Sequence, residues 1–109
     1  MFPKLRPFSR IKAKYNPTPT AKEKRHHIRL INLPCIACKG AGGVFHHLLS
    51  EATGKRWRRD HEFGLPMCDH CHRALHAHGD ERTWCQVQGF DPAIEAGMLR
   101  LESIQAGIL

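Results

Sequence analysis

The sequence predicts a small α+β domain in which a structural zinc ion holds together two short strands and a following helix (a ββα order). A basic arm precedes this unit and helices follow it. A spacer of 29 residues separates two CxxC pairs. Short apolar runs at 44–49 and 61–68 precede a segment, 69–79, whose residues are spaced as in a helix. We expect an extended arm at 1–21, the zinc-stapled domain at 22–91 and a C-terminal helix at 92–109 packed on it.

Positive charge is concentrated in the first third of the chain. Residues 1–34 hold nine Lys/Arg and one acid, a net charge of +8, whereas the whole chain carries +7. A basic arm ahead of a near-neutral domain indicates a polyanion partner, either nucleic acid or an anionic membrane. Lys12 and Lys14 are the arm's candidate DNA contacts; the alternative is a disordered tail.

The composition also excludes several classes of protein. No stretch approaches the roughly 18 apolar residues of a membrane span, and residues 1–10 lack the apolar core of a secretory signal. We therefore expect a cytoplasmic protein without a membrane partner. In that compartment, five cysteines are expected to be metal ligands or free thiols rather than disulfides.

Local sequence signals predict the helices and strands. Four prolines exclude a helix within residues 1–21. Residues 22–33 are expected to form a short helix that ends at Pro34 and turns three apolar residues inward (Ile28, Ile31 and Leu33). His26 and His27 on this helix are expected to be solvated or to contact phosphate. Residues 35–43 form a glycine-rich turn that gives the backbone freedom a metal knuckle needs.

Strands at 44–49 and 61–68 flank a polar, basic loop. The helix at 69–79 buries Leu75 and stops at Gly79, and a further helix at 80–88 ends at Gly89. Asp91-Pro92 starts the last helix, 92–106, with Asp as N-cap and Pro at the first position. Its core-facing residues are expected at helical spacing: Ile94, Met98, Leu101 and Ile104.

The two CxxC pairs predict a structural zinc site. A two-residue knuckle turns both sulfurs to one side, and two knuckles complete a tetrahedral four-cysteine site with the ligands Cys35, Cys38, Cys68 and Cys71. The alternatives are a redox CxxC, which lacks a thioredoxin-like setting here, and buried free thiols. Cys85 stands apart from both pairs and is expected to be a core thiol.

Four histidines fall on the elements that this zinc would tie together. His46 and His47 lie on the first strand. His72 and His76 are four residues apart on a helix, so they share a face and can bind one metal ion. This constellation predicts a metal-dependent active site.

The order CxxC, HH, basic loop, LPMCxxCH and a further His resembles the HNH (ββα-metal) endonuclease superfamily. The segment HHLLSEATGKRWRRDHEFGLPMCDHCHRALH is similar to phage and prophage HNH proteins related to the recombination-enhancement, RecA-dependent nucleases, and the likeness covers about residues 33–97. The resemblance implies that His47 is the general base and that His46, His72 and His76 hold the catalytic metal. The middle position, normally Asn, falls on His61, with Asp60 as the alternative.

The implied chemistry is phosphodiester hydrolysis. A neutral imidazole accepts a proton near pH 7, and a divalent metal polarises the phosphate and stabilises the departing oxygen. Imidazole ligands favour Zn²⁺, Mn²⁺, Ni²⁺ or Co²⁺, and the resemblance keeps Mg²⁺ or Mn²⁺ as candidates.

The loop between the strands carries a cluster that can contact nucleic acid: Lys55, Arg56, Trp57, Arg58 and Arg59. Its cations can clamp phosphates while Trp57 stacks on a base or sugar. The alternative is a solvated loop with Trp57 folded onto the core.

These observations together predict a metal-dependent HNH endonuclease that nicks or cuts DNA, double- or single-stranded, in phage recombination, repair or processing. A recombinase filament is a possible partner. Two other interpretations are a non-catalytic zinc module that binds DNA and a secreted toxin of the HNH type. The histidines favour the enzyme over the module, and the zinc knuckles weigh against the toxin.

Overall fold

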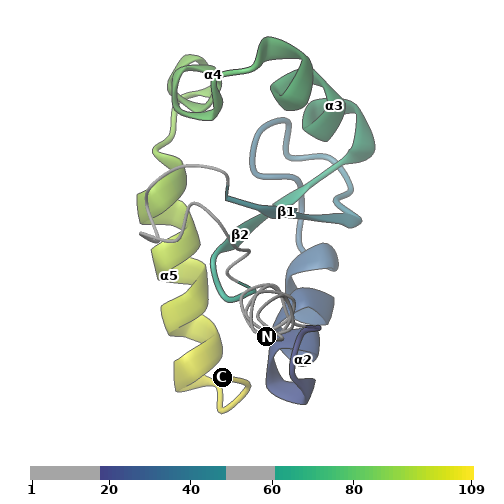
Figure 1. The fold of residues 1–109 in the computed structure, drawn as a ribbon, viewed down its shortest axis with the longest axis vertical. Helices are drawn as coiled ribbons and strands as arrows, with labels where there is room; N and C mark the ends of the chain where they lie inside the picture. Colours follow the sequence, from purple (N-terminus) through teal and green to yellow (C-terminus); the bar gives the residue numbers. More distant parts are fainter. Residues whose placement is uncertain (1–17, 49–60) are drawn as a thin grey trace, which may run out of the picture.

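The computed structural model describes residues 18–48 and 61–109, which form two short strands and four helices (Figure 1). Their order is α2 (Ala21–Ile31), β1 (Val44–His47), β2 (Gly64–Met67), α3 (Asp69–His78), α4 (Glu81–Gln88) and α5 (Pro92–Gln105). The α+β class is therefore confirmed. Within the described part of the chain, no helix is both long enough and apolar enough to cross a bilayer.

The strands pair antiparallel, with Val44 opposite Met67 and His47 opposite Gly64. Because successive side chains of a strand point to opposite faces, His46 and His47 face opposite sides of the hairpin. His46 lies against the histidines of α3, and His47 lies against His27 of α2. Figure 1 shows α3 and α4 beyond one side of the hairpin and α2 beyond the other, with α5 running alongside.

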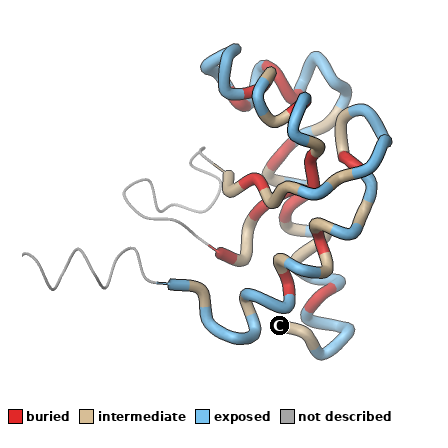
Figure 2. Tube along the Cα trace, turned by 90° about the vertical axis from the view of Figure 1, so that its right-hand side faces the viewer, coloured by how far each residue is buried: buried red, intermediate tan, exposed pale blue. Residues whose placement is uncertain are grey.

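The core lies around β2, all four of whose residues are buried (Figure 2). Helices cover both of its sides, so this strand needs no polar face. The buried apolar cluster joins β2 to the cysteine knuckles and to α3, α4 and α5 through Cys35, Leu65, Met67, Cys71, Leu75, Trp84, Cys85 and Ala96.

Side-chain caps and left-handed residues fix the helix ends. Thr20 and Glu23 form a capping box that starts α2 one residue before the predicted position. The predicted stops of α3 and α4 are confirmed, since Gly79 and Gly89 both have positive φ. Asp91 caps α5 through the N–H groups of Ala93 and Ile94, as its sequence predicted.

The predicted inner face of α5 is wrong. Ile94 and Met98 are 60% and 55% exposed, and Leu101 and Ile104 are exposed as well. The buried residues are instead Pro92 at the start of the helix and the small residues Ala96 and Ser103. Small side chains let α5 approach α2 closely enough for the Arg29 guanidinium to donate to the Ser103 hydroxyl (2.9 Å) and the Leu99 carbonyl (2.9 Å).

The predicted inner face of α2 is wrong at Ile28, whereas Ile31 and the following Leu33 are half-buried. Ile28 is 58% exposed, and the buried residues are His26 and Leu30. His26 is not solvated: its Nε2 donates to the Glu62 carbonyl (3.0 Å), and its Nδ1 lies 2.7 Å from the Ser103 hydroxyl. Ser103 accepts from Arg29 and can donate to a neutral His26, so every polar group in this contact is satisfied.

We predict that His26 makes the stability of the fold sensitive to acid. Burial lowers the pKa of His26 below its ordinary 6.5. The unfolded chain therefore takes up this proton first as the pH falls through 6.5, and stability is lost progressively below that pH. Urea midpoints between pH 7.5 and 5 should fall less steeply in His26→Gln, which keeps a donor and an acceptor but cannot titrate. Equal slopes in the two proteins would contradict this role.

Candidate metal centres

Four cysteine sulfurs converge where the knuckle at 35–38 meets the start of α3. The Sγ atoms of Cys35, Cys38, Cys68 and Cys71 all lie within 4.8 Å of one another. The Cys38 and Cys68 sulfurs are 3.8 Å apart. Tetrahedral zinc with bonds of about 2.3 Å sets its sulfurs about 3.8 Å apart, so the donor set and its spacing fit zinc.

The backbone prepares both knuckles for a metal. The N–H of Gly40 donates to Cys38 Sγ (3.4 Å) and the N–H of Cys71 donates to Cys68 Sγ (3.3 Å). Directly after Cys38 the left-handed residue is Lys39 (φ 68°), whereas Gly43 has a positive φ (111°) at the end of the turn, so glycine supplies only part of the expected freedom. The Ile36 N–H donates to the Pro66 carbonyl (2.9 Å), so the first knuckle is tied to β2.

The acidities of the thiols also favour a bound cation. Burial raises the pKa of Cys35, but hydrogen bonds from the main chain at Cys38, Cys68 and Ala37 outweigh it and lower that pKa to about 6. Burial and the neighbouring cysteines raise the pKa of Cys71. Four thiolates this close therefore form together only around a positive ion.

The fifth cysteine stays outside the cluster. Cys85 is fully buried on α4, and burial with the nearby charges of Glu81 and Asp91 raises its pKa to about 12. It is the inert core thiol that its position predicted. None of the five cysteines forms a disulfide.

A histidine triad lies on the α3 side of the hairpin. One nitrogen of each of His46, His72 and His76 lies within 4.8 Å of the others, and the Nε2 atoms of His72 and His76 are 3.1 Å apart. His46 is buried, His72 half-buried and His76 exposed. The triad is therefore open to solvent on the His76 side, as a metal centre with a free coordination position requires. Burial, with the charges of His46 and His76, lowers the pKa of His72 and favours its neutral, ligating form.

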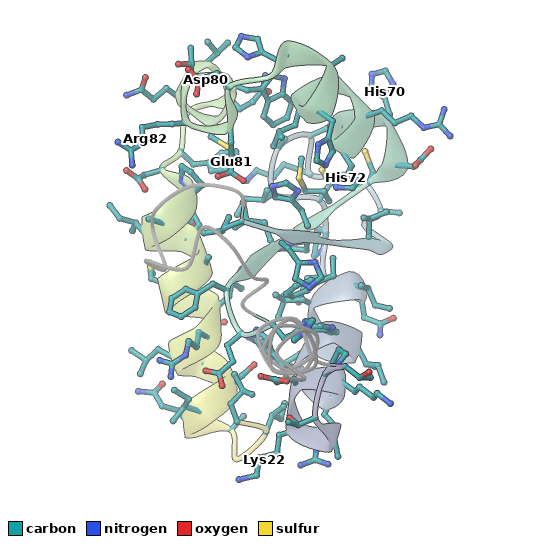
Figure 3. The ribbon with its side chains drawn as sticks, viewed as in Figure 1. Lys22, His70, His72, Asp80, Glu81 and Arg82 are labelled. Atoms are coloured by element: carbon teal, nitrogen blue, oxygen red, sulfur yellow. The ribbon has the colours of Figure 1, made fainter. Side chains whose placement is uncertain are left out.

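Glu81 orients the buried member of this triad. Nε2 of His46 donates to the Glu81 carboxylate at 2.6 Å, and both side chains are buried. This leaves the lone pair on His46 Nδ1, the one buried side-chain nitrogen or oxygen without a hydrogen-bond partner among residues 18–48 and 61–109. Metal-binding histidines commonly give their other N–H to a carboxylate in this way. Figure 3 shows Glu81 and His72 directed toward the interior and His70 directed away.

The predicted base and middle residue come together on the other face of the hairpin. Nε2 of His47 lies 3.1 Å from Nδ1 of His61, and the two rings meet edge to face. His61 lies in the turn before β2 rather than within the strand. Asp60, the alternative for the middle position, lies outside the described residues, as do Lys12, Lys14 and the cluster at 55–59.

Sequence reasoning missed two residues of these sites. Glu81 lies 35 positions from His46 and reads as an ordinary acid in the first turn of a helix, so no local signal marks it. His27 was expected to be solvated or bound to phosphate. Instead it is half-buried, its ring stacks on Phe45 at 3.9 Å, and its Nε2 donates to the His61 carbonyl at 2.7 Å.

Comparisons with protein-family models, with curated proteins and with solved structures give no match to this chain.

We expect the purified protein to hold about one zinc ion per chain that survives dialysis against EDTA. Cys68→Ser should abolish this zinc and lower the unfolding midpoint, because a structural zinc contributes directly to folding. Cys85→Ala is the matched control, since it also removes a cysteine from the core but leaves the cluster intact. Elemental analysis decides the matter, and a folded, zinc-free wild-type protein would refute the site.

We also expect Glu81→Gln to weaken metal binding at the histidine triad by about 10–100-fold, the usual effect of losing such an orienting carboxylate. Calorimetric titration with Mn²⁺ or Co²⁺ measures this change. Glu95→Gln removes an acid from the first turn of α5 and controls for the general effect of charge at a helix start. Unchanged affinity in Glu81→Gln would show that the carboxylate does not support the triad.

Proposed function

We propose that this chain is a metal-dependent endonuclease of the HNH type that hydrolyses DNA phosphodiester bonds. The observation that carries the proposal is the buried, unpartnered Nδ1 of His46, on a ring fixed by Glu81 and facing His72 and His76. A divalent metal such as Mg²⁺, Mn²⁺ or Zn²⁺ on these nitrogens would polarise the scissile phosphate and stabilise the departing oxygen.

The opposite orientations of His46 and His47 suit this reaction. In an in-line displacement the attacking water and the departing oxygen lie on opposite sides of phosphorus. Adjacent residues of a strand point to opposite faces, so a phosphate at the end of β1 would have the triad on one side and His47 on the other.

His47 would take the proton from the attacking water, and His61 would assist it. A contact of 3.1 Å between their nitrogens requires one ring to donate and the other to accept. His61 can therefore hold the His47 ring in place, and the resemblance likewise implies that the middle residue orients the base.

The substrate class follows from charge. Three neutral imidazoles leave the full charge of a metal ion at the site, which favours a polyanion. The basic arm and the cluster at 55–59 would bind the phosphate backbone without reading sequence. The sequence resemblance to phage HNH proteins is the reason to propose a role in phage DNA recombination, repair or processing and to test a recombinase filament as a partner.

Supercoiled plasmid tests the proposal directly. Nicking or cutting should require an added divalent metal, stop with EDTA and fall about 10²–10⁴-fold in His47→Ala, the usual contribution of a general base. His72→Ala should abolish metal-dependent cleavage as well.

His70→Ala is the matched control, because it removes an exposed histidine of α3 that belongs neither to the His46, His72 and His76 triad nor to the His47–His61 pair. It should cleave like the wild type. Tight DNA binding without cleavage under any metal, including in the presence of a recombinase filament, would instead support the non-catalytic zinc module.

A further inference from the structure

The face of the hairpin opposite the triad carries a second group of three histidines. His27 comes from α2, His47 ends β1 and His61 precedes β2, and one nitrogen of each lies within 4.8 Å of the others. Phe45 holds this group in place, because its ring stacks on His27 and meets His47 edge to face. Nothing in the proposed hydrolysis requires His27.

The rings are placed so that nitrogens converge. The 3.1 Å between His47 Nε2 and His61 Nδ1 is close to the roughly 3.3 Å that separates two nitrogens bound to one tetrahedral zinc. The ring of His27 stands nearly perpendicular to that of His47 (89°) and tilted to that of His61 (53°). Its hydrogen bond to the His61 carbonyl already positions it at the cluster.

The ligand chemistry of this group is restricted to transition metals. Among the residues that the structure describes, it offers three imidazoles and no carboxylate, and the neighbouring Glu62 bonds Arg100 at 2.7 Å. Such a donor set selects Zn²⁺, Co²⁺, Ni²⁺ or Cu²⁺ and disfavours Mg²⁺, which prefers oxygen. Burial lowers the pKa of His27, which favours the neutral ring that metal binding needs.

We propose that His27, His47 and His61 form a second transition-metal site, and that its occupation inhibits the enzyme. A metal bound to the lone pair of His47 leaves that residue unable to accept the proton of the attacking water. Inhibition rests on the function proposed above, whereas metal binding does not. Both clusters offer three imidazoles, so Zn²⁺ can bind at either one, and only its binding at the second would block the base.

Replacement of His27 by Gln tests the second cluster without changing the first. Glutamine can keep the hydrogen bond to the His61 carbonyl, but it is a poor zinc ligand, and His27 is not part of the proposed catalytic machinery. Equilibrium dialysis with Zn²⁺ should give one fewer ion per chain in His27→Gln than in the wild type. His78→Gln, which changes an exposed histidine of α3 outside the clusters, should bind as the wild type does.

The plasmid assay supplies the second readout. With the activating metal held constant, half-inhibition of His27→Gln should need at least about tenfold more added Zn²⁺ than the wild type, since loss of a ligand weakens binding more than loss of an orienting partner does. If the variant fails to fold, the wild type can be titrated with Zn²⁺ while NMR monitors its histidine rings. Added Zn²⁺ should shift the His27 and His61 signals in one step and the His72 and His76 signals in another.

The outcomes are distinct. Equal zinc stoichiometry in the wild type and in His27→Gln, or absence of the separate NMR step, overturns the second site. Loss of one ion with unchanged zinc inhibition overturns the inhibitory role. Loss of one ion in a protein that never cleaves DNA supports the site and refutes the proposed function instead.

Discussion

Four residue pairs join β1 to β2, and this short antiparallel register positions each of the three candidate metal sites among the described residues. At one end, Val44 opposite Met67 brings the first cysteine knuckle beside Cys68 and the start of α3. At the other, His47 opposite Gly64 brings the first strand beside the turn that holds His61. A slip of one residue would exchange the faces of His46 and His47 and separate each from its cluster. The hairpin itself is too small to be stable alone, so its register depends on the helices and knuckles packed around it.

Polar groups make up an unusual share of what is buried here. His26, His46, His61, Glu81 and Ser103 are all buried, and an unpaired group in such a place costs about 1–3 kcal/mol. Each of these histidines has a polar partner: Ser103 and Glu62 for His26, Glu81 for His46, and His47 for His61. The unpartnered Nδ1 of His46 stands out against this background, and a metal ion would satisfy it.

The sequence predicted what is encoded locally. The knuckles, the shared face of His72 and His76 and the helix stops at Gly79 and Gly89 all depend on residues within four positions of each other. Periodicity on α5 showed which residues share a face but not which face is buried, because small residues such as Ala96 allow closer packing than Ile94. Contacts between distant segments, such as His46 with Glu81 and His26 with Ser103, have no local signature and required the structure.

The first turn of α3 belongs to two sites at once, since Cys71 is a cysteine of the zinc cluster and His72 is the next residue. A newly made chain would therefore have no ordered histidine triad until its four cysteines had captured zinc. Disorder at the cysteine cluster would therefore spread to the histidine triad, although the two groups share no ligand.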